Sequence, residues 1–219
     1  MKRSLKEWVV RVITLLVGLT IAHLGVTLFL LSELGSDPFN VLIQGIYRRL
    51  SAMTGWCFLT HGRVHIGACF LIIVVLLFLD RSYIKIGTVL CMICGGPIID
   101  FFTMILGPLS IQTMALPVRI LVLVLGCVIL AYGMTIVIKS DAGTGPNDLV
   151  AIVISDKLQK KFSIVRIIVD VCFVAVGWVL GGVVGLGTVI CAFLVGPVAG
   201  IFLPVNGCLV DRIVRTFAA

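Results

Sequence analysis

Two short turns with acidic and amide side chains are the first places where this sequence could do chemistry. Residues 33–40 (ELGSDPFN) are echoed by residues 141–148 (DAGTGPND), with an acid, a glycine and a proline in register. Proline at the start of a helix leaves free N–H groups at the positive end of the helix dipole. If the turns meet, they offer a site for an anion or a polar substrate; otherwise each only caps a helix at the membrane surface. The candidate binding residues are Asp37, Asn40, Gln44, Thr144, Asn147 and Asp148.

Ionisable residues inside apolar runs are the second set of candidates, because a charge at the centre of a bilayer costs several kcal/mol. Asp100 lies in one such run, where the matching position of a related run holds Gly200. A repeated structure therefore does not require this acid. It is a candidate for proton coupling or substrate binding, or else a hydrated acid near the membrane surface. Arg166 and Asp170 are four residues apart, so they share a helix face and can pair. They are coupling candidates or a neutralised structural pair.

Other patterns give weaker signals of chemistry. His61 and His65 have the spacing to bind a metal from one helix face, but no third ligand is nearby in the sequence, so we expect no metal site. Cys91 and Cys94 are spaced like a redox pair, yet the second copy keeps only Cys191, which favours packing. The chain has no HExxH, no GxSxG and no close carboxylate pair, so we expect neither an enzyme nor a cofactor.

The composition indicates that a membrane surrounds these residues. Sixty per cent of the 219 residues are hydrophobic and 12% are charged, a balance that a water-exposed surface does not allow. About 20 apolar residues cross the hydrocarbon core as a helix. The predicted fold is all-α and polytopic, with about six transmembrane helices and two short helices that rise only about 15 Å each. The predicted spans are 12–31, 64–79, 86–105, 120–138, 164–180 and 183–203, and the short helices are 38–47 and 146–155.

A second repeated motif indicates a duplication. Residues 86–97 contain Gly-Thr-Val-x-Cys followed by Gly-Pro, and residues 186–197 repeat these residues at unchanged spacing. We therefore predict two membrane repeats, 1–108 and 109–219, within a single membrane domain. Three crossings in each repeat is an odd number, so the two copies would have opposite orientations, as in many secondary transporters.

The net charge of +7 does not indicate nucleic-acid binding, because the basic residues lie at the ends of the apolar runs. They predict contact with the headgroups of the lipid bilayer and a cytoplasmic location for both termini. If the short helices also crossed, giving eight spans, the distribution of Lys and Arg would fit about equally well. Only the length of the short segments favours six.

These motifs resemble the YczE/YyaS/YitT group of bacterial membrane proteins. The likeness rests on the Gly-Ser-Asp-Pro-Phe-Asn turn at 35–40, its copy at 143–148 and the two Gly-Thr…Gly-Pro helices, and it covers nearly the whole chain. It implies a small multi-pass protein of the bacterial inner membrane. Members of the group are suspected of transport, some are linked to production of secreted peptide metabolites, and the group supplies no catalytic motif. Its usual turn continues as Pro-Trp-Asp, so Phe39-Asn40 leaves open whether Asp37 takes over the role of that acid.

Transport of a small solute or ion is the leading functional hypothesis. Inverted repeats, interrupted helices and an intramembrane acid are features that alternating access uses, and coupling to protons would run through Asp100. Two alternatives stay open: a non-catalytic accessory protein that supports a partner enzyme or export system, and the substrate-capture subunit of an ATP-driven transporter. A homo-oligomer or a membrane partner protein is compatible with each of them.

Cysteine labelling distinguishes six crossings from eight. With six, Arg49→Cys reacts with a membrane-impermeant thiol reagent from outside the cell and Lys85→Cys reacts from inside. Eight crossings reverse both results. The measurement compares intact cells with inverted vesicles, using the unsubstituted chain, which has eight cysteines, as the background. Reaction of Lys85→Cys in intact cells would contradict the six-span topology.

Overall fold

The computed structural model describes residues 4–160 and 162–218, and the described part of the chain is built from helices. This confirms the predicted all-α fold. Two helices begin at prolines, and short 3-10 turns follow α3 and α4. The longer helices are α1 (Leu5–Ser32), α3 (His61–Leu79), α4 (Ile86–Leu106), α5 (Leu116–Ser140), α7 (Phe162–Val179) and α8 (Leu186–Ala218); the proline-initiated ones are α2 (Pro38–Thr54) and α6 (Pro146–Leu158).

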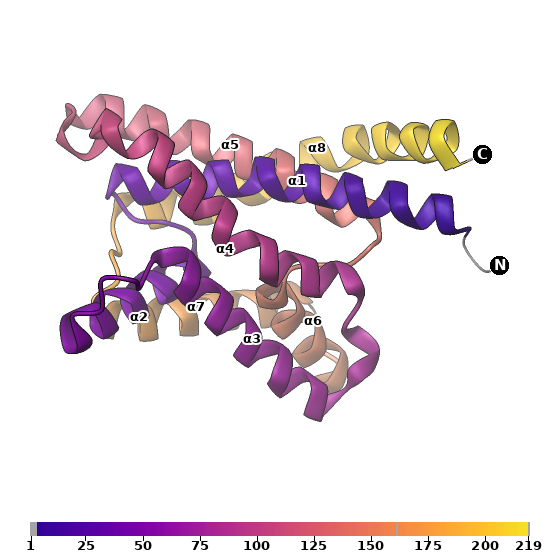
Figure 1. The fold of residues 1–219 in the computed structure, drawn as a ribbon, viewed down its shortest axis with the longest axis horizontal. Helices are drawn as coiled ribbons and strands as arrows, with labels where there is room; N and C mark the ends of the chain where they lie inside the picture. The colour runs from indigo at the N-terminus through magenta and orange to yellow at the C-terminus, as the bar shows by residue number, and fades with distance from the viewer. Residues whose placement is uncertain (1–3, 161, 219) are drawn as a thin grey trace.

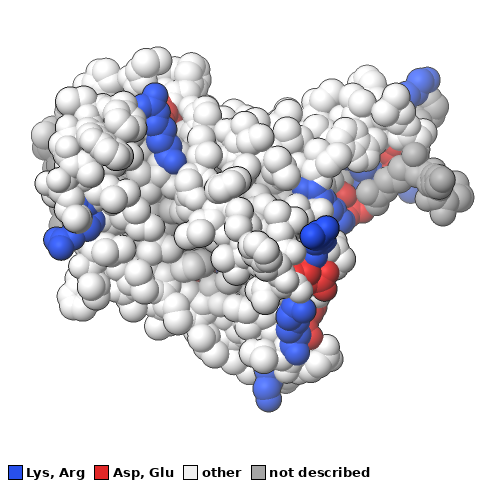
Figure 2. All heavy atoms as spheres, turned by 60° about the horizontal axis from the view of Figure 1, so that its bottom comes forward, with Lys and Arg blue, Asp and Glu red and all other residues white. Residues whose placement is uncertain are grey.

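Five helices in the described residues are long and apolar enough to cross a membrane, namely α1, α3, α4, α5 and α8. The remaining predicted span, 164–180, coincides with α7, an apolar helix of 18 residues that is not among the five. Many large apolar side chains point outward, as Phe78 does with 88% exposed. Figure 2 shows a broad uncharged face with Lys, Arg, Asp and Glu gathered in a few places. The fold is that of a polytopic membrane protein.

The predicted starts of the two short helices are confirmed, whereas their predicted ends are wrong. α2 runs to Thr54 rather than to position 47, because Arg48 and Arg49 are good helix formers, and it stops at Gly55 in the left-handed conformation (φ 63°). α6 ends at Leu158 rather than at 155. At about 1.5 Å per residue the two helices span about 25 Å and about 20 Å. Neither reaches across the roughly 30 Å hydrocarbon core.

Glycines bring α1 and α5 into backbone contact. A Cβ atom added at Gly25 would lie 2.6 Å from the carbonyl oxygen of Gly126, and one added at Gly133 would lie 2.6 Å from that of Gly18. The residue numbers rise along one helix as they fall along the other, so the two helices are antiparallel. Close packing of small residues is a main source of helix association in lipid.

An arginine ties each end of this helix pair. Arg119 of α5 donates from Nε to the carbonyl oxygen of Ser32, 2.9 Å away, at the end of α1. Arg11 of α1 donates to the carbonyl oxygen of Ser140, 3.0 Å away, at the end of α5. The two arginines lie equally far before their respective serines in the two halves of the sequence. Carbonyl groups that the ends of both helices leave free are thereby satisfied.

The Gly-Thr motifs at the starts of α4 and α8 each pack against the turn of the other half. Gly87 N donates to the carbonyl oxygen of Ala142 at 3.1 Å, and Gly187 N donates to that of Leu34 at 2.7 Å. Gly35 lies so close to α8 that an added Cβ would be 2.5 Å from the Thr188 hydroxyl. Each Gly-Thr motif therefore holds the turn of the other half in place, and we call this contact the seat of that turn.

Figure 1 shows α1, α5 and α8 lying side by side, with α4 crossing from α1 towards α3. Helices α2, α7 and α6 form the remainder of the fold, and both termini lie at one end of the molecule. The two halves differ here. α3 packs on α4 through Gly62 and Gly96, whereas α7 packs along α2, and an added Cβ at Gly196 of α8 would meet nothing within 4 Å.

Replacing Gly25 by leucine tests the backbone contact between α1 and α5. The added side chain has no space, and overpacking of this kind costs about 1–3 kcal/mol. We expect a lower thermal unfolding midpoint in detergent, followed by loss of the monodisperse peak on gel filtration. Gly67→Leu on α3 is the matched control, since an added Cβ there would meet nothing within 4 Å. Equal stability of the two variants would contradict the packing role.

Candidate functional site

The start of α2 carries a chain of polar contacts. Asp37 is the N-cap, and its carboxylate accepts hydrogen bonds from the backbone N–H of Asn40 (3.3 Å) and from the Asn40 side-chain amide (2.9 Å). The side-chain amide oxygen Oδ1 of Asn40 lies 3.2 Å from Nε2 of His61 at the start of α3. The first turn is thereby joined to α3, and Asn40 is almost fully buried.

The start of α6 carries an ion triad. Arg166 of α7 donates from one terminal nitrogen to Asp148 at 2.6 Å and from Nε to Asp170 at 3.0 Å. Asn147 donates from its amide to Asp148 at 3.1 Å. The Arg166 side chain is 31% exposed, so the triad is partly open. The predicted pair of Arg166 and Asp170 is present, with a third member that the four-residue spacing does not indicate.

These two groups of residues approach one another. The charges of Arg166 and Asp170 act on Asp37, which places the first turn within electrostatic reach of the triad. The rings of Phe39 and Phe173 meet beside it with centroids 5.5 Å apart. The structure therefore pairs two carboxylates with one guanidinium, and a third carboxylate, from the first turn, lies within electrostatic range of that guanidinium. Of the predicted residues it brings together Asp37, Asn40, Asn147, Asp148, Arg166 and Asp170.

Gln44 and Asp100 lie elsewhere. Gln44 accepts a hydrogen bond from the backbone N–H of Val183 at 2.8 Å, on the link between α7 and α8. Asp100 accepts from the Thr60 hydroxyl at 2.6 Å and from the backbone N–H of Gly62 at 3.0 Å. These partners satisfy donors at the N-terminus of α3 and fasten it to α4. Asp100, which is replaced by Gly200 in the second copy, thus lies at the contact of α3 with α4. In the second half, α7 packs along α2 instead.

The positive ends of α2 and α6 already face carboxylates of their own. Asp37 caps α2, and Asp148 lies in the first turn of α6. An acid in such a place offsets the helix dipole. An anionic ligand would therefore gain little from either end. This favours the polar-substrate form of the prediction over the anionic form.

Histidines lie beside the first turn, a contact that the sequence did not predict, although the spacing of His61 and His65 was noted. His23 and His65 meet edge to face with ring centroids 5.6 Å apart, and Phe39 packs on His65 in the same way. The one hint in the sequence was that all three histidines lie in the first half of the chain, on either side of this turn. Within the described ranges no three His, Cys, Asp or Glu side chains are grouped to hold a metal ion.

A cavity of about 250 Å³ opens beside the second turn. Thr144, a predicted binding residue, lines it together with Gly143 of the turn. At its rim Lys85 pairs with Asp141 at 3.1 Å. The Tyr83 hydroxyl, also in the lining, donates to Asp156 at 2.9 Å, and this hydrogen bond raises the pKa of the tyrosine above its ordinary value.

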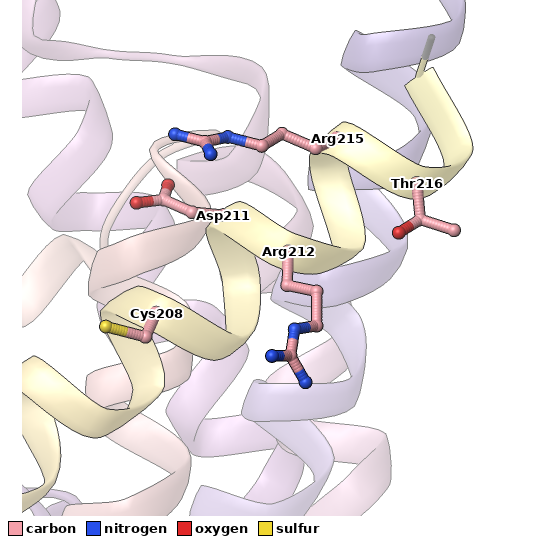
Figure 3. A pocket seen from close by; sticks show the side chains of 5 residues that line it. All are labelled: Cys208, Asp211, Arg212, Arg215 and Thr216. Carbon is pink, nitrogen blue, oxygen red and sulfur yellow. The ribbon is translucent and has the colours of Figure 1, made fainter.

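A larger hollow, of about 340 Å³, lies at the end of α8. Figure 3 shows its five lining side chains, all from this one helix, with Arg212 and Arg215 extending in different directions. Binding sites are generally built where several elements converge. This hollow, which α8 alone lines, is therefore a weaker candidate than the junction of the two turns.

The fold and the paired turns define a polytopic α-helical membrane protein with two proline-initiated half-helices. Comparison with known sequences places it further: residues 9–204 match the Family of unknown function (DUF6198), and the chain belongs to this family.

Among its relatives is the "Uncharacterized membrane protein YczE" of Bacillus subtilis, 30% identical over 91% of this chain and 88% of the relative. An "Uncharacterized protein" of Haemophilus influenzae is 30% identical over 86% and 81%. The "Uncharacterized protein YyaS" of B. subtilis is 23% identical over 86% and 90%. These relatives bear out the resemblance seen in the sequence. No solved structure matches the chain.

Substitution of Arg166 by methionine tests the triad. Two carboxylates would lose their charged donor, and hydrogen bonds to charged groups contribute about 1.5–3 kcal/mol each before allowance for exposure. We expect a lower unfolding midpoint in detergent and partial recovery when Asp170→Asn is added, since that change removes the repulsion between the carboxylates. Arg49→Met, at an exposed position of α2, is the control. Equal unfolding midpoints of Arg166→Met and Arg49→Met would show that the triad does not stabilise the fold.

Proposed function

We propose that this protein is a small secondary transporter of the bacterial inner membrane that moves a polar solute, cationic or rich in hydrogen-bond donors. The observation that carries this proposal is that the start of one half-helix lies within electrostatic range of an ion triad at the start of the other. Asp37 from one half lies within reach of the triad formed by Asp148, Arg166 and Asp170 from the other. A site between discontinuous helices is the arrangement that secondary transporters use for substrates and coupling ions.

The two halves, 1–108 and 109–219, are on this proposal inverted repeats. Three reciprocal sets of contacts support it: the glycine crossings of α1 and α5, the arginine ties at their ends, and the seating of each turn on the Gly-Thr motif of the other half. The axis that relates two antiparallel membrane helices lies in the plane of the membrane. Basic residues at span ends support cytoplasmic N- and C-termini.

The charge of the site supports the proposed class of solute. The cluster holds an excess of acidic over basic groups, three carboxyl groups against one guanidinium. Both helix starts are already compensated by acids, so this excess is available to a cation or to donor groups. The Ser36 hydroxyl, 2% exposed and next to Asp37 in the chain, has no partner among the described residues. A buried hydroxyl without a partner is a feature that a polar ligand would satisfy.

Proton coupling has two candidate carboxylates on this proposal. Asp170 lies in the cluster itself and shares Arg166 with Asp148, so uptake of a proton there would change the charge that the solute meets. Asp100 lies at the junction of α3 and α4, where protonation would weaken its hold on the start of α3. The first acts directly on the solute and the second acts through the position of a helix.

Uptake into proteoliposomes tests the proposal. The probes are small amines, guanidinium compounds and alkali cations, each supplied with and without a proton gradient. We expect saturable uptake of at least one class, reduced about tenfold or more by Asp148→Asn, since a charge-assisted contact contributes at least about 1.4 kcal/mol. Asp170→Asn or Asp100→Asn should abolish the response to the proton gradient.

Asp211→Asn, in the hollow at the end of α8, is the matched control and should leave uptake unchanged. Absence of uptake in every class, with protein that elutes as a single peak, would overturn the transport proposal. If uptake is present but both Asp170→Asn and Asp100→Asn keep the response to the gradient, proton coupling through these acids is wrong.

A further inference from the structure

Each turn lies beside a contact between two helices, and we call these two contacts the first and the second mouth. At the first, α2 lies against the end of α7; at the second, α6 lies against the end of α3. Matching positions can be compared, because Gly45 and Val153 stand equally far after Pro38 and Pro146.

The first mouth is closed by backbone contact. A Cβ added at Gly45 would lie 2.3 Å from the carbonyl oxygen of Gly177, and one added at Gly182 would lie 2.4 Å from that of Val41. Gln44 closes the same place from the side, since its carbonyl oxygen accepts from the backbone N–H of Val183 at 2.8 Å. No side chain stands between the two helices at the glycine contact.

The second mouth holds larger residues and a cavity. Val153 stands in the place of Gly45 and packs with Leu76 and Leu149, and Ile152 stands in the place of Gln44 and lines the cavity of about 250 Å³. On the opposite helix Leu77 stands where the first mouth has Gly177. The helices are thus joined by apolar side chains and by the hydrogen bond from Tyr83 to Asp156 at the rim.

The turn residues beside the two mouths also differ in their exposure. Ser36, behind the first, is 2% exposed. Thr144, its counterpart behind the second, is partly exposed and lines the cavity. The second turn therefore borders an open cavity, whereas Ser36 of the first turn is covered. The open side is the end of the molecule that carries the start of α1, because Arg11 contacts the end of α5 next to this turn.

We propose that these mouths are the two gates of the transporter, captured with the first closed and the second open, and that transport exchanges the two arrangements. This inference rests on the proposed function. Small residues on both sides let α2 and α7 close and separate without repacking large side chains. Because Val153 packs with Leu76 and Leu149 at the second mouth, where the first has a glycine contact, the second closes less readily. The molecule therefore rests open towards the end that holds its termini.

Thiol labelling of the turns measures the state of each gate without a known substrate. The background is the full chain with the exposed Cys57, Cys172 and Cys208 replaced by serine. In proteoliposomes permeabilised to a hydrophilic maleimide, we expect Thr144→Cys to react several-fold faster than Ser36→Cys. Equal rates for the two cysteines would overturn the assignment of open and closed gates.

Exchanging the gate residues tests the coupling of the two mouths. Gly45→Val should hold the first gate apart, so that Ser36→Cys reacts several-fold faster and Thr144→Cys more slowly. Val153→Gly should let the second gate close and slow Thr144→Cys by itself. Gln44→Ala, which only removes the hydrogen bond to Val183, is a milder variant expected to act in the direction of Gly45→Val. Gly67→Val is the control and should change neither rate.

Opposite changes in the two rates support the exchange. If Gly45→Val and Gln44→Ala leave both rates unaltered, or raise both together as local unfolding would, the inference is wrong. Uptake measured on the same background separates this result from the proposed function. Uptake without reciprocal labelling would contradict the gates but not the transport function. Reciprocal labelling without uptake would contradict the transport function alone.

Discussion

Close backbone contact between α1 and α5 is the constraint on which the other elements depend. It is possible only because Gly18, Gly25, Gly126 and Gly133 carry no side chain into the interface. With the helices so close, Arg11 and Arg119 reach the opposite helix ends and fix where each helix stops. The turns that follow, and therefore the starts of α2 and α6, are positioned by this pair. A shift along the α1–α5 contact would move both halves of the candidate site.

The candidate site shows how a membrane protein can keep charge inside an apolar fold. Its carboxylates are not isolated: Asp37 accepts from Asn40, and Asp148 and Asp170 share Arg166. Each acid at a helix start also offsets a dipole that lipid would not screen. The cluster thus satisfies most of its hydrogen bonds internally while holding more acidic than basic groups. On the proposed transport function, that combination suits a site that binds a polar solute and also releases it.

Much of the fold follows from patterns that the sequence displays directly. Runs of about 20 apolar residues predict spans, and Pro38 and Pro146 predict the starts of the half-helices, because both are set by local chemistry. The ends of the half-helices were less accessible, since Arg48 and Arg49 continue a helix as readily as they begin a loop. In the site, the four-residue spacing predicts the pair of Arg166 and Asp170. The contact with Asp148 comes from the packing of α6 on α7, which no local pattern encodes.

The reciprocal seating of the turns bears on how the chain is made. Gly87 at the start of α4 has its hydrogen-bond partner at Ala142, which is synthesised after the whole first half has entered the membrane. The first half therefore waits in the bilayer with the start of α4 unpaired, and folding cannot finish locally as helices emerge. The second turn can pair with Gly87 once Ala142 has been made, whereas Leu34 of the first turn waits for Gly187 at the start of α8. A chain arrested before residue 142 therefore lacks both contacts, and one arrested between residues 142 and 187 lacks only the contact of the first turn.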